Sequence, residues 1–151
     1  PEERDDELFV TATATANGSD VTVWFENRSA WPPTVRSRLT LRYFVHVSAS
    51  LDPAAVRVVT AESECGPEAA APRLRKRREG VYYVEVSCVG TDVFPGGVAH
   101  HRKRVRFSFE APPEFQSSDA PSLLGLQPGA PTKAPGIAMY DDGRRVWGRE
   151  P

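Results

Sequence analysis

The stretch Ile137-Ala-Met-Tyr-Asp-Asp-Gly-Arg-Arg-Val-Trp-Gly-Arg-Glu-Pro151 has the pattern of a β-hairpin with an aromatic-rich end. Its turn is predicted at Asp142-Gly143, because glycine accepts the positive φ angle that a tight hairpin requires. The residues on both sides alternate as half-buried strands do. Trp147, in the second arm, is predicted to pack in the core or between strands. The segment therefore predicts a pair of strands at this end of the chain.

The same two-residue alternation recurs earlier, over residues 9–16, 21–26, 38–47, 56–63, 81–89 and 102–110. Turn-forming residues such as Asn17-Gly18 separate these segments. Many short strands without a convincing helix predict an all-β fold, a two-sheet β-sandwich or jelly roll with one core about 10 Å thick. Residues 69–80 form the most polar insert and are expected to be a mobile connection. Their basic run, Arg73-Leu-Arg-Lys-Arg-Arg78, fits a solvated loop better than a contact for an acidic surface.

Composition excludes several classes of protein. The chain has 151 residues, a usual length for one domain, and its 19 basic and 20 acidic residues give a net charge of -1. It lacks the positive excess that drives nonspecific nucleic-acid binding, so we expect no nucleic-acid partner. No apolar run approaches the roughly 20 residues that span a bilayer, so we expect no membrane partner either.

The ends of the chain suggest how it is organised. Residues 1–6 are predicted to be a linker remnant and residues 7–151 one module. The opening segment, Pro1-Glu-Glu-Arg-Asp-Asp-Glu7, is too charged for a signal peptide. Because the chain opens without methionine and closes on Arg-Glu-Pro, we expect a piece of a longer protein whose targeting signal lies elsewhere.

The sequence offers little support for an enzyme. Asp141 and Asp142 are adjacent but fall in the predicted turn, where aspartate is favoured by its local hydrogen bonds. His100 and His101 are neighbours at a strand entry, so their side chains point to opposite faces and do not easily share a metal. The sequence contains no glycine-rich phosphate loop, Gly-x-Ser-x-Gly elbow or His-Glu-x-x-His motif. We therefore predict no catalytic residues.

Cys65 and Cys88 are the only cysteines. An even count is compatible with one disulfide in an oxidising compartment, and equally with two buried or independent thiols. Cys88 falls on the apolar side of its strand, whereas Cys65 reads as the end of a strand entering a loop. The sequence leaves both states open.

A binding face is better supported than a catalytic site. In the segment Arg102-Lys-Arg-Val-Arg-Phe-Ser-Phe109, the apolar side chains share one face and must point inward, which sets Arg102, Arg104 and Arg106 in a row outside. Same-face residues on a strand lie about 6.6 to 6.8 Å apart, so such a row can follow a linear ligand and donate hydrogen bonds to its hydroxyl groups. An edge strand protected by charge is the alternative.

Several segments, in order along the chain, resemble one known family. They are Asn27-Arg-Ser-Ala-Trp-Pro-Pro33, Leu41-Arg-Tyr-Phe-Val45, Val81-Tyr-Tyr-Val-Glu-Val86, Val93-Phe-Pro-Gly-Gly97 and the terminal hairpin. Together they resemble a family 3 carbohydrate-binding module, and the first points to the subtype that follows the catalytic domain of family 9 cellulases. The resemblance implies a jelly roll, secretion, binding of cellulose or a single β-1,4-glucan chain, and a family 9 catalytic domain in the same polypeptide.

The resemblance also implies a shallow groove on one sheet face, with Arg42, Phe44, Tyr83 and Glu85 at matching positions. There, an aromatic ring stacks on the apolar face of a pyranose while charged groups bind its hydroxyls. Phe44 and Tyr83 could instead be packed by neighbouring loops. The flat aromatic strip of autonomous cellulose binders is not matched, because residues 62–80 have no aromatic side chain. We therefore predict a helper module that guides a glucan chain along Arg42, Phe44, Tyr83, Glu85, Arg102, Arg104 and Arg106. An autonomous anchor and a sandwich without a sugar ligand are the alternatives.

Two further features follow from the resemblance. Family members bind a structural calcium, and the matching positions here are His46, Ser48, Ser118 and Asp119. Only one of these is a carboxylate, so His46 would contribute its backbone carbonyl, and without the ion Asp119 would cap or brace its loop. Trp31 is predicted to contact the catalytic domain, with local packing as the alternative.

Overall fold

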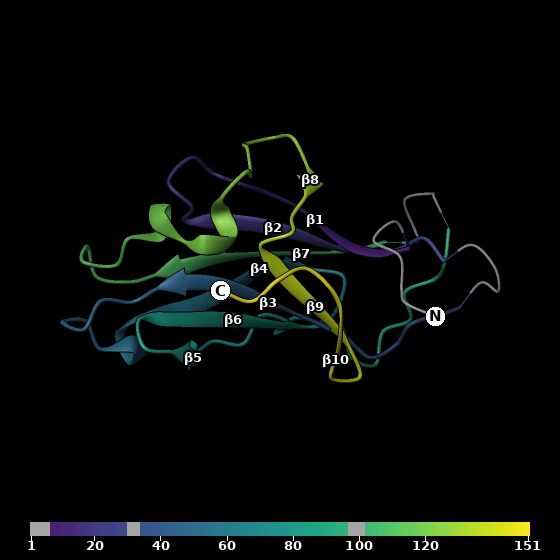
Figure 1. Ribbon diagram of the computed structural model, residues 1–151, viewed down its shortest axis with the longest axis horizontal. Helices are drawn as coiled ribbons and strands as arrows, with labels where there is room; N and C mark the ends of the chain where they lie inside the picture. The colour runs from purple at the N-terminus through teal and green to yellow at the C-terminus, as the bar shows by residue number, and fades with distance from the viewer. Residues whose placement is uncertain (1–6, 30–33, 97–101) are drawn as a thin grey trace.

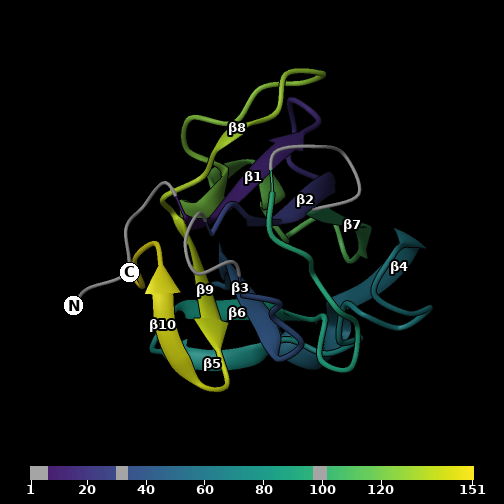
Figure 2. The ribbon, with the colours of Figure 1, turned by 90° about the vertical axis from the view of Figure 1, so that its right-hand side faces the viewer.

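The computed structural model describes residues 7–29, 34–96 and 102–151 and consists of two antiparallel sheets packed face to face (Figure 1). The first sheet has the strand order β4-β7-β2-β1-β8 and the second β10-β9-β3-β6-β5. Figure 2, turned by 90°, shows them as two layers, with β1, β2 and β7 above β3, β6 and β9. The prediction of an all-β sandwich is confirmed.

The first sheet comprises β1 (Leu8–Ala14), β2 (Asp20–Asn27), β4 (Arg57–Ser63), β7 (Arg102–Glu110) and β8 (Thr132–Lys133). The second comprises β3 (Leu39–His46), β5 (Arg75–Arg78), β6 (Val81–Ser87), β9 (Ile137–Asp141) and β10 (Arg144–Trp147). Three short 3₁₀ turns of the described chain complete the list: η1 (Pro53–Ala55), η3 (Ser117–Asp119) and η4 (Pro121–Leu123).

The core lies between the sheets and follows from the alternation along the strands. Val105 and Phe107 of β7 are fully buried, as are Leu41 and Tyr43 of β3 in the opposite sheet. The rings of Tyr43 and Phe107 meet edge to face with their centroids 5.6 Å apart. Because successive side chains of a strand alternate in direction, the residues between these point outward on both sides of the molecule.

The terminal hairpin forms as predicted. Asp142 and Gly143 have φ angles of 51° and 85°, the positive values that a two-residue turn with the twist of a hairpin needs at both positions. Trp147 is buried in the core, and its indole nitrogen donates a hydrogen bond of 3.1 Å to the carbonyl oxygen of Ala134.

One sequence-based expectation about an individual strand, and one alternative, are wrong. Part of residues 69–80 forms the edge strand β5, because Arg75 and Lys76 pair with Tyr83 and Tyr82 of β6. Its four exposed basic residues suit an edge, where charge opposes pairing with another chain. Conversely, β7 is not an edge strand, because it lies between β2 and β4. The charge on β7 therefore does not serve to protect an edge.

Cys65 and Cys88 form a disulfide, with their Cα atoms 4.8 Å apart. Cys65 follows β4 of the first sheet and Cys88 follows β6 of the second. The bond therefore joins the two layers of the sandwich.

Candidate functional site

The residues predicted to form one binding face lie on two opposite faces of the sandwich. Arg102, Arg104 and Arg106 project from β7 on the outer face of the first sheet, whereas Arg42, Phe44, Tyr83 and Glu85 belong to the outer face of the second. The expectation of one continuous face is wrong, because the sheets pack through their inner faces and their outer faces point apart. Each outer face must be considered by itself.

The outer face of the second sheet carries a small apolar cluster of its own. Phe44 is completely buried and Tyr83 only 8% exposed, and they pack with Val81, Ala138 and Tyr140. The η4 segment is attached to this cluster through Ser122. The backbone nitrogen of Phe44 donates a hydrogen bond of 2.7 Å to the Ser122 hydroxyl, and that hydroxyl donates one of 2.6 Å to the carbonyl of Gly136. The two rings are therefore not available to stack on a sugar, and the alternative of packing by neighbouring loops is correct.

Arg42, on the same face, is enclosed by aromatic rings. Its guanidinium carbon lies 4.6 Å from the ring centroids of both Tyr83 and Tyr140, a favourable cation–π arrangement. Glu150 lies over the same group: it pairs with Arg42 at 3.3 Å and Arg77 at 2.9 Å, and it accepts a hydrogen bond from the Tyr140 hydroxyl. Glu85, the remaining predicted residue of this face, is 3.7 Å from Arg75, and its side chain is 27% exposed, about as much as the 29% of Arg42.

These contacts perturb two ionisable groups. Burial, together with the bond to Glu150, raises the pKa of Tyr140 to about 12. The bond from Tyr140 and the nearby charges of Arg77 and Arg42 lower the pKa of Glu150 despite its partial burial. The pair is thus held as a neutral phenol donating to a carboxylate.

The segment that carries Glu150 is fixed by the backbone. Gly148 has a φ of 77°, and a Cβ atom there would lie only 1.9 Å from the carbonyl oxygen of Ile137. Only glycine fits so close an approach at that angle. The backbone nitrogen of Arg149 then donates to the carbonyl of Pro135 at 3.0 Å. Glu150 therefore covers the part of the second sheet's outer face around Arg42 and Tyr140.

The outer face of the first sheet is exposed at Arg104 and Glu62, partly exposed at Trp24 and Arg106, and organised by cross-strand ion pairs. Arg106 donates two hydrogen bonds to the Asp20 carboxylate, at 3.0 and 2.9 Å. Arg102 pairs with Glu26 at 3.3 Å, and Arg104 with Glu62 at 3.8 Å. The predicted row of three arginines is present, and each has a carboxylate partner on a neighbouring strand. Their charges are balanced and their positions are fixed.

Sequence reasoning overlooked Trp24 on this face. It is partly exposed on β2, paired across the sheet with Thr11 of β1 and Arg104 of β7. The guanidinium carbon of Arg102 lies 5.0 Å from the centroid of its ring. The alternation of residues 21–26 could have located it, because Trp24 falls on the side opposite Val23 and Phe25.

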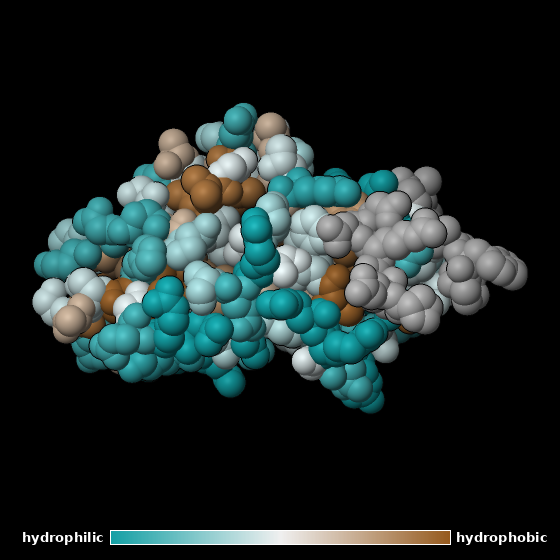
Figure 3. Space-filling model, in the orientation of Figure 1, coloured by the Kyte–Doolittle hydropathy of each residue, from teal (hydrophilic) through white to brown (hydrophobic). Residues whose placement is uncertain are grey.

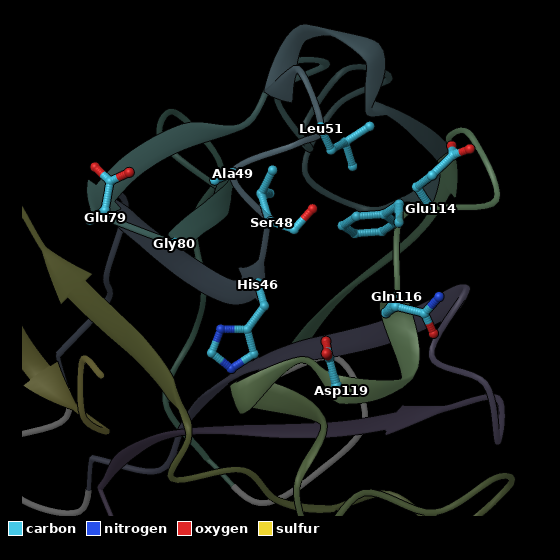
Figure 4. Close-up of a pocket in the computed structure, with 11 residues that line it drawn as sticks. His46, Ser48, Ala49, Leu51, Glu79, Gly80, Glu114, Gln116 and Asp119 are labelled. Carbon is cyan, nitrogen blue, oxygen red and sulfur yellow. The ribbon is translucent and has the colours of Figure 1, made fainter.

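Three of the four residues expected to bind calcium line one hollow of about 350 Å³: His46, Ser48 and Asp119, drawn in Figure 4 with Glu114 and Gln116. Ser118 lines a neighbouring hollow, which Asp119 also borders. Calcium takes six to eight oxygen ligands, and Asp119 is the single carboxylate of the four. Over the described ranges, no three His, Cys, Asp or Glu side chains are grouped closely enough to hold a metal ion. The donor set therefore fits calcium poorly.

The loop around Asp119 is held by direct bonds instead. The Ser117 hydroxyl donates to the carbonyl of Asn17 at 2.7 Å. Gly18, with a φ of 72°, lets this approach occur, because a Cβ atom there would be 2.4 Å from the Ser117 carbonyl oxygen. These contacts, with those of Ser122, attach the η3 and η4 segments to the sandwich.

Comparison with known proteins identifies the family. The family model described as "Cellulose binding domain" matches residues 7–148. The chain belongs to family 3 of the carbohydrate-binding modules. The match covers nearly the whole chain, so this family 3 module is a noncatalytic, cellulose-binding domain rather than an enzyme.

Relatives of the module are parts of longer proteins. The module is 35% identical to Endoglucanase B of Cellulomonas fimi; the match covers 100% of this chain and 15% of that protein. It is 28% identical to Endoglucanase 4 of Bacillus sp. strain KSM-522, and this match covers 100% of this chain and 25% of that protein. Its fold matches that of endoglucanase CelQ from Clostridium thermocellum, solved with cellobiose and cellotriose, with a TM-score of 0.81, 24% identity, and coverage of 100% of this chain and 27% of CelQ. The fold also matches that of a scaffoldin family 3b module from Bacteroides cellulosolvens, with a TM-score of 0.75 and 16% identity. This match covers the full length of both chains.

Some predictions for the family 3 module concern residues that the structure does not describe. Trp31, expected at a domain interface, lies outside the described residues, as do His100, His101 and residues 1–6. Of the remaining chain, no helix is long and apolar enough to cross a membrane. The surface in Figure 3 is largely hydrophilic, with an apolar patch near η4, where Leu124 is 87% exposed.

Proposed function

We propose that this family 3 module binds a single β-1,4-glucan chain on the outer face of its first sheet and guides the chain toward the catalytic domain of a secreted family 9 endoglucanase. The observation that supports this choice is the row of Arg102, Arg104 and Arg106, which stands fixed on an open face. Guanidinium groups held in ion pairs keep further N–H donors for sugar hydroxyls. The residues predicted on the second sheet are less available, because Phe44 and Tyr83 are buried and Arg42 is held by Tyr83, Tyr140 and Glu150.

The first-sheet face suits one chain better than a crystal surface. Adsorption to crystalline cellulose in this family relies on a flat aromatic strip, and residues 62–80 contain no aromatic side chain. On the outer face of β2, Trp24 is the aromatic residue. A face with one ring among arginines and threonines can bind a short stretch of glucan weakly, which is what a guiding module requires.

The proposed partner rests on the relatives and on one motif. The chain spans 15% of Endoglucanase B and 27% of CelQ, so most of each relative lies outside the matched region. Both are endoglucanases by name. The family 9 assignment rests on the resemblance of Asn27-Arg-Ser-Ala-Trp31 to the subtype that follows such catalytic domains. The Cys65–Cys88 disulfide supports secretion, because disulfides persist in oxidising environments.

The test is the hydrolysis of insoluble cellulose by a full-length enzyme carrying this module. We expect an Arg104→Ala, Arg106→Ala double variant to lose activity on insoluble cellulose and to retain it on a soluble substrate. Arg38→Ala is the matched control, because Arg38 is also an exposed, ion-paired arginine, 3.4 Å from Asp142, but lies off the face. Unchanged activity of the double variant would contradict the proposal. Strong retention of the isolated module on microcrystalline cellulose would instead indicate an anchor.

A further inference from the structure

The first-sheet face contains a row of polar side chains with one aromatic ring in it. Thr11, Trp24 and Arg104 stand opposite one another on β1, β2 and β7, and Thr13, Thr22 and Arg106 form the next row. Neighbouring rows on one sheet face are about 6.6 to 6.8 Å apart along the strand. The ring is therefore one step from a set of hydroxyl and guanidinium groups.

The second row opens into a hollow of about 250 Å³. Thr13, Asp20, Thr22 and Arg106 line it, and Pro128 and Gly129 of the loop before β8 form its rim. The Thr13 hydroxyl donates to the carbonyl of Gln127, which ties this loop to the sheet. The hydroxyl of Thr22 makes no hydrogen bond within the described part of the chain. The hollow thus offers a hydroxyl, a carboxylate and a guanidinium at fixed positions.

Trp24 is held in place by an ion pair between a buried glutamate and a partly exposed arginine. Glu26 is 1% exposed, accepts a hydrogen bond of 2.7 Å from Thr11, and lies 3.3 Å from Arg102. Arg102 in turn lies over the Trp24 ring. Because one side of the indole is fixed in this way, Arg102 acts as a positioning residue, and the exposed part of the ring is presented to solvent in a defined orientation.

We propose that Trp24 and the hollow beside it form a sugar subsite of this face, in which one glucosyl unit packs on the indole and the next places its hydroxyls among Thr22, Asp20 and Arg106. This inference rests on the proposed function and adds residues to it. A ring beside a few convergent polar groups is the usual composition of a site for a ligand with apolar and polar faces.

The charges on the face select a neutral ligand. Arg102, Arg104 and Arg106 each have a carboxylate partner, Glu26, Glu62 or Asp20. A polyanion laid along this row would approach three carboxylates. A neutral β-1,4-glucan needs no compensating charge and can use the same groups as donors and acceptors.

The test is calorimetric titration of the chain with cellohexaose, with polygalacturonate as an acidic comparison. We expect Trp24→Ala to weaken cellohexaose binding about tenfold or more, Trp24→Phe to restore most of it, and Thr22→Val to weaken it several-fold. Phe94→Ala is the control, because Phe94 is an exposed aromatic residue that lies off this face. Polygalacturonate should give no binding heat.

The outcomes separate the two proposals. If the unmodified chain binds cellohexaose and the Trp24 and Thr22 variants bind equally well, the subsite is wrong and the proposed function stands. If the unmodified chain binds no cellohexaose, both are wrong. Should Trp24→Ala lose its native circular dichroism, the Trp24→Phe and Thr22→Val variants decide, since the first keeps an aromatic ring and the second keeps the shape of the side chain. Tighter binding of polygalacturonate than of cellohexaose would overturn the assignment to a neutral glucan.

Discussion

Breaking the disulfide between Cys65 and Cys88 should destabilise the module strongly. The two cysteines are 23 residues apart, and the bond joins the end of β4 in one sheet to the end of β6 in the other. In the chain-entropy treatment, a cross-link that closes a loop of this length lowers the entropy of the unfolded state and raises the free energy of unfolding by about 3 kcal/mol. Backbone bonds within the loop, such as Ser87 to Ala69 at 2.9 Å, exist in the folded state and do not replace the cross-link in the unfolded one.

The expected effect is large enough to measure directly. For a domain of about 150 residues, a change of 1 kcal/mol shifts the melting temperature by about 2–4 °C, so we expect a loss of roughly 6–12 °C on reduction. The denaturant m value should rise at the same time, because the reduced unfolded chain exposes more surface. Both quantities follow from the effect of the cross-link on the unfolded state.

The assay compares the oxidised and reduced chain by thermal and guanidinium unfolding. Cys88 is fully buried and Cys65 nearly so, so the protein should be reduced in denaturant and refolded with reductant present. A Cys65→Ala, Cys88→Ala variant is the control, since reductant should not shift its melting temperature further. A change below about 2 °C, with both thiols shown to be free by mass, would refute the reasoning.

Three other predictions concern side chains whose environments the structure defines. Tyr43→Phe should raise the free energy of unfolding by about 1 kcal/mol in urea titrations, because the Tyr43 hydroxyl is buried, has no hydrogen-bond partner in the described chain, and has its pKa raised by burial. Alkaline titration should show a loss of stability that Tyr140→Phe reduces. The unfolded chain releases the Tyr140 proton near pH 10 and the folded chain near pH 12, so the contribution of this residue is complete below pH 10, is lost as the pH rises through 12, and amounts to at most about 3 kcal/mol. The loss that remains in the variant comes from Tyr43, whose pKa is also raised by burial. Calcium should not stabilise the module, so melting temperatures with calcium and with EDTA should agree within about 1 °C; a rise with calcium concentration would show that the loops around Asp119 hold the ion after all.

The direction of each strand side chain was determined by the sequence alone. Alternation placed Arg104 and Arg106 opposite Val105 and Phe107, because the two-residue period is a property of the extended backbone. The turn at Asp142-Gly143 was equally local, since it depends on which residues tolerate a positive φ. Features that depend on one strand, or on one turn, could be predicted.

Only the tertiary structure decided which outward residues are accessible and which lie together. Phe44 points away from the core, yet it is buried by Tyr83, Tyr140 and the η4 segment, whose Ser122 is far from it in sequence. Arg42 and Arg106 both point outward but on opposite faces, because strand pairing assigned β3 and β7 to different sheets. Alternation alone sets Trp24 outward, but its neighbours Thr11 and Arg104 were fixed only by the pairing of β2 with β1 and β7. Exposure and proximity depend on contacts between distant segments, and a pattern within one strand carries no information about them.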